Sequence, residues 1–413
     1  MEMETLFSKA LGIVDPWYIS GVVFDSEKKR LNIGVDFKKG SLFNYKNEEG
    51  EVKDYKAYDT VEKTWRHMNF FEHECYLVVR VPRIKPDCGG IKMIFPPFSG
   101  ACKGFTLLFE SFLLQMCRNM PIHQVGKLMK VSDQRLWRLI ECYVQKGRFE
   151  LDMSHLKQLG IDETSRLRGH DYITLFVDLL ARKTLHIEEG KGSETISNFA
   201  AQLKDNQGVP DQITDVSCDM SPAFIKGVRE TFKNAEITFD RFHIMKLVNE
   251  ALDDVRREEA RTQPVLKGAR YALLKNDANL TEKQRKQKTH ISQYNLKTGE
   301  ALRMKEAFQA LYGADSIEEF ESLLTQWHEW ASGSKLPPFE KLAKTIEKHW
   351  DGIVMWKKSN INNGILEGLN SLIQAAKRKA RGYGKKHFET MAYFLTAKLD
   401  LHKFNPYLPT GFV

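Results

Sequence analysis

Three acidic residues far apart in the chain have the types and positions needed to hold a divalent metal ion. Asp162 ends the predicted strand LGIDE, Asp219 ends the predicted strand ITDVSCDM, and Glu367 lies near the start of a predicted helix. If the two strands are neighbours in one sheet, the carboxylates at their ends lie side by side and repel each other. A hard cation such as Mg²⁺ removes this repulsion and prefers oxygen ligands. The pattern therefore predicts that the three carboxylates share metal ions.

The predicted helix that carries Glu367 has a polar face that changes from acidic to basic along its length. Its apolar face includes Leu366 and Ile373, and its polar face begins with Glu367 and Asn370. A carboxylate for metal followed by cations for phosphates suits a helix lying along DNA. The alternative is an amphipathic surface helix with a solvated polar face. The basic residues that we expect to bind DNA phosphates are Lys377, Arg378, Lys379, Arg381, Lys385 and Lys386.

Other acids compete for a place in this site. Glu163 adjoins Asp162 but points to the other side of the sheet if its strand continues. Asp178 is expected to shape a hairpin, and Asp215 lies nearer the start of its strand than Asp219 does. Asp240 sits on a fifth predicted strand.

The segment from about 155 to 243 alternates strands and helices in an order that can bring these acids together. Three consecutive strands precede a helix, a strand, a helix and a strand, with Ser221 and Pro222 forming a strong helix start. This is the order of a ribonuclease-H-like fold, whose mixed sheet carries helices on both faces. Long charged helices over 244–350 predict a helical insertion. The predicted class is α/β, preceded by a β-rich module and a helix-turn-helix.

The amino-terminal region predicts a β-rich module followed by three helices. Thr106, Pro121 and Ser132 fit the starts of these helices. The unit resembles a helix-turn-helix, whose third helix can enter the major groove of DNA. The DNA-contacting residues would be Gln134, Arg135 and Arg138, and a plain three-helix bundle is the alternative. The predicted domains are 1–102 (β-rich module), 103–150 (helix-turn-helix), 151–243 (catalytic core), 244–350 (insertion) and 351–413 (second part of the catalytic core).

Composition and cysteine usage limit the class of protein. The 413 residues include 62 Lys and Arg against 54 Asp and Glu, and the net charge of +8 weakly favours a polyanionic partner. No apolar run is long enough to span a membrane, and the first residues lack the pattern of a signal peptide. The six cysteines are scattered and form no C-x-x-C pair, which favours a reduced cytoplasmic protein.

Several segments resemble bacterial insertion-sequence transposases of the ISL-three family, which are DDE enzymes. They are GIDETSRLRGHDYITLFVDLLARKTLHIEEGK, SCDMSPAFIKGVRETFKNAEITFDRFHIMKLVNEALDDVRREE and NNGILEGLNSLIQAAKRKARGYG. The resemblance implies that the family's catalytic acids fall on Asp162, Asp219 and Glu367. It also aligns Asp240 and His243 with a [C/D]-x-x-H signature expected near the active site.

The resemblance extends into the amino-terminal module, with one departure. The segment YDTVEKTWRHMNFFEHECYLVVRVPRI looks like the surroundings of the family's zinc-binding module. Family members usually carry paired cysteines there, but Asn44 to Asn47 stand where one C-x-x-C would be, and Pro86 with Cys88 replaces the second pair. We therefore expect a module that kept its β-fold without zinc.

The activity that the resemblance implies is DNA transposition. Such an enzyme binds the terminal inverted repeats of its element and performs Mg²⁺-dependent strand cleavage and transfer into target DNA by two-metal catalysis, with Mn²⁺ able to substitute. Because two ends must be joined, a homodimer or larger assembly is expected. The alternatives are a catalytically inactive, domesticated DNA-binding regulator and a nuclease of the same fold that does not transfer strands.

Overall fold

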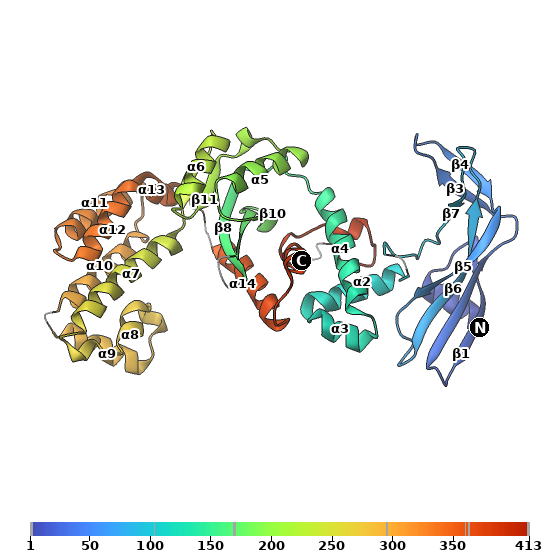
Figure 1. Ribbon diagram of the computed structural model, residues 1–413, viewed down its shortest axis with the longest axis horizontal. Coiled ribbons are helices and arrows are strands. Elements are labelled where there is room, and N and C mark those ends of the chain that lie inside the picture. The colour runs from blue at the N-terminus through green and yellow to red at the C-terminus, as the bar shows by residue number, and fades with distance from the viewer. Residues whose placement is uncertain are drawn as a thin grey trace. The chain divides into compact units, whose positions relative to one another are not determined.

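The computed structural model describes residues 3–102, 104–167, 171–294, 296–359, 361 and 364–410. The chain divides into two compact units: Met1–Glu150 with Ile373–Val413, and Leu151–Leu372. The β-rich module of the first unit and the second unit each have a separate buried apolar core. Figure 1 labels many of the elements of both units.

The first unit begins with α1 (Met3–Leu11) and the predicted β-rich module. Leu31, Ile33 and Val35 alternate with more exposed residues along β2, as expected for a strand with one buried face. The main sheet has the order β1 (Trp17–Asp25), β2 (Arg30–Phe37), β6 (Glu74–Ile84) and β5 (Asp59–Arg66), with β7 (Lys92–Met93) paired to β6. A separate ribbon pairs β3 (Leu42–Lys46) with β4 (Val52–Lys56).

The three predicted helices follow this module. They are α2 (Leu107–Asn119), α3 (Ile122–Met129) and α4 (Asp133–Phe149). The Thr106 hydroxyl accepts a hydrogen bond from the Phe109 N–H and caps α2, as expected. Lys130 takes the left-handed conformation (φ 52°) and ends α3, which lets buried Val131 lead the chain into α4.

The end of the chain packs against α2 and α4 within the same unit. In α15 (Lys385–Thr396), His387 stacks on Trp137 of α4 with the ring centroids 3.9 Å apart. After the turn η4 (Leu401–Lys403), buried Asn405 donates hydrogen bonds to the Leu107 carbonyl (2.8 Å) and to the Tyr143 hydroxyl (3.0 Å). The Tyr143 hydroxyl in turn donates to the buried Glu110 carboxylate (2.7 Å).

This packing differs from the predicted segment 351–413. The boundary between the compact units falls at 372/373, inside α14 (Gly364–Lys379), so the last part of the chain groups with the helix-turn-helix region. The amphipathic pattern of α15 indicates that one face is buried. The pattern does not say which element covers that face, because sequence periodicity reports only the direction of burial.

The second unit contains a five-stranded mixed sheet. The strands are β8 (Gln158–Leu167), β9 (Asp171–Asp178), β10 (Lys183–Glu189), β11 (Asp215–Cys218) and β12 (Glu236–Phe239). They lie in the order β10-β9-β8-β11-β12. The pairs β10–β9 and β9–β8 are antiparallel, whereas β11 is parallel to both β8 and β12. The predicted succession of three strands, helix, strand, helix and strand is therefore present.

Helices cover both faces of this sheet. On one face, α5 (Glu194–Asp205) brings Phe199 into a stack on Phe176 of β9 (4.4 Å between centroids), and α6 (Pro222–Thr231) packs beside α5. On the other face, Leu366 of α14 lies directly over Gly160 of β8. The glycine allows this close approach, and it sits two residues before Asp162 on the same side of the strand.

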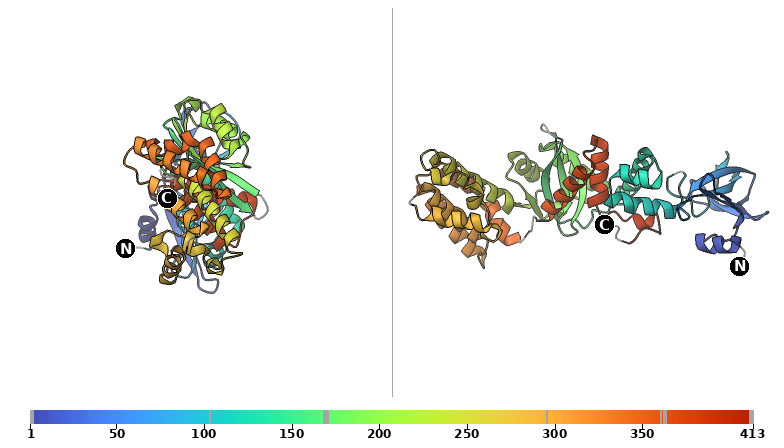
Figure 2. Two further views of the ribbon diagram at one scale, coloured as in Figure 1. Left: turned by 90° about the vertical axis from the view of Figure 1, so that its left-hand side faces the viewer. Right: turned by 90° about the horizontal axis from the view of Figure 1, so that it is seen from below.

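The predicted helical insertion is a bundle between β12 and α14 (Figures 1 and 2). Its interior is aromatic, with Phe308 against Trp327, whose indole N–H donates to the Met304 carbonyl (2.8 Å). No helix in the described ranges combines the length and apolar character needed to cross a membrane. The helices are α7 (Arg241–Glu259), α8 (Arg270–Leu274), α9 (Glu282–Ser292), α10 (Lys297–Leu311), α11 (Ile317–Gly333), α12 (Pro337–Lys348) and α13 (Trp350–Ser359).

Gly352 in α13 provides a test of the packing that supports strand β12. A Cβ atom at this position would lie within 3.0 Å of the Phe239 ring, which is rigid and buried. We expect Gly352→Ala to lower the free energy of unfolding by about 1–3 kcal/mol through overpacking. Gly333→Ala in α11, where nothing lies within 4 Å, should change it by less than about 0.5 kcal/mol. Chemical denaturation followed by circular dichroism measures both, and equal effects would contradict the packing.

Candidate active site

Three aspartates lie at one level on adjacent parallel strands. In the register of β11, Ser217 pairs with Gly160 of β8, and Cys218 pairs with Phe239 of β12. Asp219 directly follows β11. Continuing the register along the strands therefore sets Asp219 beside Asp162 on one side and beside Asp240 on the other.

The electrostatics of Asp162 agree with this placement. The pKa of the Asp162 carboxyl is raised to about 6, mainly by burial and to a smaller extent by the charges of Asp240 and Asp219. The charge of His243 and the hydrogen bond from the Glu163 N–H (2.9 Å) act in the opposite direction. Asp162 is thus a buried carboxylate within the fields of two others.

Asp240 and His243 form a pair at the start of α7. Asp240 is only 6% exposed and caps the helix by accepting a hydrogen bond from the Phe242 N–H (2.8 Å). Its other carboxylate oxygen lies 3.2 Å from His243 Nδ1. The hydrogen bond to Asp240 is the largest cause that raises the pKa of His243, and the charges of Asp162 and Asp219 add to it. The D-x-x-H spacing thus pairs His243 with Asp240, and both act on the electrostatics of Asp162.

Glu367 is exposed on α14, and another residue of that helix reaches Asp162. The Asn370 side-chain amide donates a hydrogen bond to Asp162 Oδ2, while its own Oδ1 is buried without a hydrogen-bond partner. Glu367 instead lines a cleft of about 1010 Å³ together with Asp240. Across the part of the chain that the structure describes, no three His, Cys, Asp or Glu side chains are gathered closely enough to hold a metal ion. The strand register aligns the three aspartates, and Glu367 shares a cleft with Asp240, but the structure does not gather the three predicted ligands.

The chemistry of the gathered donors nevertheless suits a hard divalent cation. Asp162 and Asp219 offer carboxylate oxygens, and the buried Oδ1 of Asn370 is an amide oxygen that nothing satisfies. Oxygen donors of these two kinds are the ligands that Mg²⁺ and Mn²⁺ prefer. The sequence placed Asn370 on the polar face of its helix without assigning it a role, although its spacing of three residues from Glu367 was the available signal.

The competing acids have other positions. The Asp178 carboxylate accepts hydrogen bonds from the N–H groups of Leu180 and Ala181 (both 2.9 Å), so it shapes the hairpin as predicted. Asp215 is the first residue of β11, at the opposite end from Asp219. Glu163 follows Asp162 within β8, and burial, with a smaller contribution from the charge of Asp219, raises the pKa of its carboxyl.

The residues predicted to contact DNA all belong to the first unit. On α4, Gln134 and Arg138 are exposed. Arg135 packs its guanidinium 4.0 Å over the Phe105 ring and donates to the Gly104 carbonyl (3.4 Å), so the loop before α2 fixes its direction.

The carboxyl-terminal basic residues lie around the end of α14 and the start of α15. Arg378, Lys379, Arg381 and Lys385 are exposed. Lys377 lies 5.7 Å from the centre of the Phe388 ring. Lys386 forms an ion pair with Glu141 of α4 and thereby joins α15 to the third helix.

Comparison with known proteins finds similarity over the helix-turn-helix region and over most of the chain that follows it. A family model described as a transposase (DDE, ISL3) matches residues 159–392, and a model described as the helix-turn-helix domain of transposase family ISL3 matches residues 96–144. The transposase for insertion sequence element IS1557 of Mycobacterium tuberculosis is 26% identical over 380 residues, covering 84% of this chain and 83% of that protein. The transposase for insertion sequence element IS1001 of Bordetella parapertussis is 24% identical over 343 residues, covering 80% and 84%. Since the first model spans more than half of the 413 residues, the chain belongs to the ISL3 family of transposases.

Proposed function

We propose that this transposase binds the terminal inverted repeats of an insertion sequence and cuts and transfers its strands, using Asp162, Asp219 and Glu367 as the catalytic acids. The observation that carries the proposal is the row of Asp162, Asp219 and Asp240 on adjacent strands, with the pKa of Asp162 raised to about 6. Such perturbed acidic groups are typical of functional sites.

The proposed core is ribonuclease-H-like. Its support is the strand order β10-β9-β8-β11-β12, with the first three strands antiparallel and the last two parallel to β8. In an open sheet with parallel strands, ligands bind beyond the carboxyl ends of those strands. Asp219 and Asp240 occupy this position.

The proposed cofactor is Mg²⁺, with Mn²⁺ as a substitute. Asp162, Asp219 and Glu367 would hold it, and it would supply charge stabilisation at the attacked phosphodiester and activate the attacking water. The protein's own groups orient the donors. Asn370 holds one oxygen of Asp162, the Ser221 N–H holds Asp219 (2.9 Å), and Asp240 directs His243. The amino-terminal module is proposed to lack zinc.

The proposed DNA contacts divide between recognition and backbone binding. Gln134, Arg135 and Arg138 contact bases or adjacent phosphates from the third helix. The basic residues from Lys377 to Lys386 bind phosphates without regard to sequence. A homodimer is the smallest assembly that brings two inverted repeats together, and we place it at the nucleoid in the cytoplasm.

A strand-transfer assay on labelled inverted-repeat DNA with Mg²⁺ tests the proposed function. A transposase releases cut ends and joins them to target DNA. A DNA-binding regulator shifts the labelled DNA without cutting it, and a nuclease cuts but forms no joined product. Either of these last two outcomes would overturn the proposal, and chelation of the metal should stop both cutting and joining.

Salt dependence tests the proposed backbone contacts. Replacing Lys377 and Arg381 with Gln should weaken binding to all DNA sequences and reduce the slope of log affinity against log salt by up to about 0.9 for each lost phosphate contact. Lys341→Gln with Lys344→Gln, two exposed lysines of α12, is the control for lost charge. Fluorescence anisotropy over a salt series measures the slope, and an unchanged slope in the first variant would place that helix away from DNA.

A further inference from the structure

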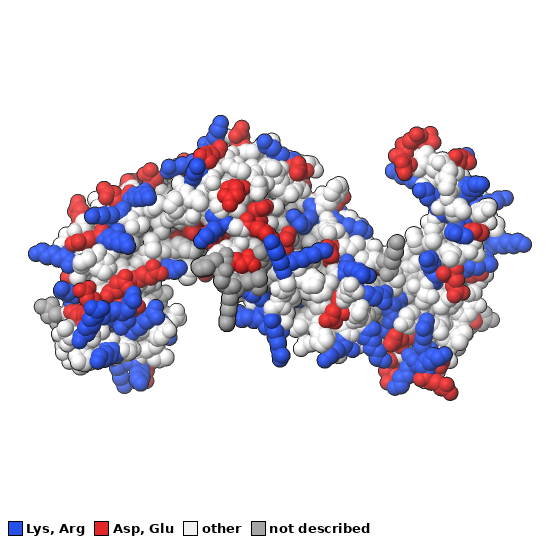
Figure 3. All heavy atoms as spheres, viewed as in Figure 1, with Lys and Arg blue, Asp and Glu red and all other residues white. Residues whose placement is uncertain are grey.

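The positive charge of the chain is concentrated in one part of the helical insertion. Residues 261–303 contain ten Lys and Arg and three Asp and Glu, a net charge of +7, against +8 for the whole chain. Residues 304–350 contain five Lys and Arg and eight Asp and Glu, a net charge of −3. The basic part comprises α8, α9 and the first half of α10. Figure 3 shows blue side chains over the lobe that these helices form.

Three cations of this lobe have no acidic partner. Lys283, Arg285 and Arg303 are exposed, and no carboxylate of the described residues forms an ion pair with any of them. Arg285 and Arg303 come from α9 and α10 and line a single cleft of about 580 Å³. Thr289 and Ser292 line the same cleft, but their hydroxyl groups already donate to the carbonyls of Arg285 (3.1 Å) and Thr289 (2.7 Å). The two guanidinium groups at this cleft are therefore the donors available for phosphate oxygens.

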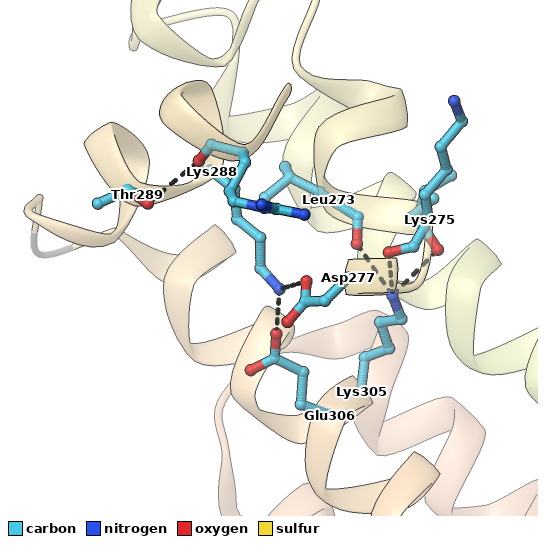
Figure 4. Close-up of polar contacts among 9 residues, drawn as sticks. Leu273, Lys275, Asp277, Lys288, Thr289, Lys305 and Glu306 are labelled. Atoms are coloured by element: carbon cyan, nitrogen blue, oxygen red, sulfur yellow. Dashed lines mark hydrogen bonds and ion pairs between the residues drawn. The ribbon is translucent and has the colours of Figure 1, made fainter. Parts of the chain in front are cut away.

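Two further lysines hold this lobe in shape. Lys288 of α9 donates to Asp277 (2.5 Å) and to Glu306 of α10 (2.6 Å), which joins three segments (Figure 4). Lys305 is only 2% exposed, and its ammonium donates to the carbonyls of Leu273, Leu274 and Lys275 at the end of α8 (3.0–3.3 Å). These contacts fix α8 and α9 on α10. The unpaired cations are therefore presented by a rigid surface, which lowers the entropy cost of binding.

We infer that this surface, centred on Lys283, Arg285 and Arg303, binds the phosphate backbone of DNA. The inference rests on the proposed function and adds a DNA contact in the insertion to those of the helix-turn-helix and the basic tail. Charge complementarity favours DNA because a duplex presents a regular row of phosphates and binding releases its counterions. No base edge needs to be read, so the surface accepts any sequence.

The test compares two full-length variants that lose the same charge. One is Lys283→Gln/Arg285→Gln/Arg303→Gln. The control is Lys341→Gln/Lys344→Gln/Lys348→Gln, whose exposed lysines lie on α12 in the acidic part of the insertion. The probe is a random-sequence DNA duplex, and anisotropy is measured over a salt series. We expect the first variant to lose up to about 2.7 units of the salt slope, at about 0.9 per contact, and the control to keep the wild-type slope.

The outcomes separate this inference from the proposed function. Equal slopes for both variants would overturn the inference and leave the proposed function intact, provided that the wild type binds the duplex. A wild type that does not bind DNA would overturn both. If the first variant keeps its slope but loses self-association in light scattering, the basic lobe binds the acidic helices of a second copy and the DNA assignment is wrong. Thermal unfolding confirms that each variant is folded.

Discussion

Replacing Asp162 or Asp219 with Asn is expected to reduce strand cleavage by at least about a thousandfold while DNA binding stays within twofold of the wild type. Each substitution removes a negative charge from the row of aspartates and keeps the side-chain shape. The loss of several kcal/mol of metal-dependent stabilisation accounts for a factor of this size. Cleavage of labelled inverted-repeat DNA at saturating Mg²⁺, with a gel-shift assay on the same DNA, measures the two effects separately.

The chain offers a matched control for these variants. Asp215 begins the strand after which Asp219 follows, so Asp215→Asn removes the same charge from the other end of β11. It should cleave at nearly the wild-type rate. Substantial cleavage by Asp162→Asn or Asp219→Asn would remove that residue from the catalytic group. If Asp215→Asn loses as much cleavage as Asp162→Asn and Asp219→Asn do, the loss in all three variants comes from a less stable sheet.

Glu367→Gln is expected to reduce cleavage to the same extent, although Glu367 is exposed and is not gathered with two other acids into a metal-holding group among the described residues. The reason is that a third acid must come from a helix beside the sheet. α14 already contacts Asp162 through Asn370, one turn from Glu367. Single-turnover cleavage with Mg²⁺ measures the effect. Measuring Mn²⁺ binding by calorimetry adds a readout that does not depend on turnover, and weaker binding is expected.

Asp240→Asn decides between Glu367 and the nearer carboxylate. If Asp240 only orients His243, this variant should retain measurable cleavage, with a loss well below that of Glu367→Gln. If Asp240→Asn abolishes both cleavage and Mn²⁺ binding while Glu367→Gln retains them, the third ligand is Asp240, and the assignment of Glu367 is wrong. Asp240 is buried and Glu367 is exposed, so the two substitutions can affect folding differently. Thermal unfolding of both variants must therefore accompany the cleavage and Mn²⁺-binding measurements.

The positions of Asp162 and Asp219 at the ends of neighbouring strands could be predicted, because the local sequence pattern and the order of the strands determine them. A short apolar strand followed by an acid places that acid at a sheet edge, and the order of elements makes β8 and β11 neighbours. The helix starts at Thr106 and Ser221–Pro222 were predictable for a similar reason, since capping depends on adjacent residues.

The contact of Asn370 with Asp162 could not be predicted from these patterns. The two residues are 208 positions apart, and which side chain of α14 reaches the sheet depends on how the helix is rotated over Gly160. Helical and strand periods give the face of an element, whereas the partner of that face is decided by packing across the whole unit.

The packing of residues 399–405 against α2 and α4 has a consequence for truncation. Leu399 and Leu401 cover Gly147, and Asn405 completes the buried polar group formed with Tyr143 and Glu110. Asn405 and Tyr143 are 262 positions apart in the sequence. A chain cut before Leu399 would therefore expose Gly147 and leave Tyr143 and Glu110 without Asn405, so the helix-turn-helix unit cannot be isolated by cutting the chain after α4 alone.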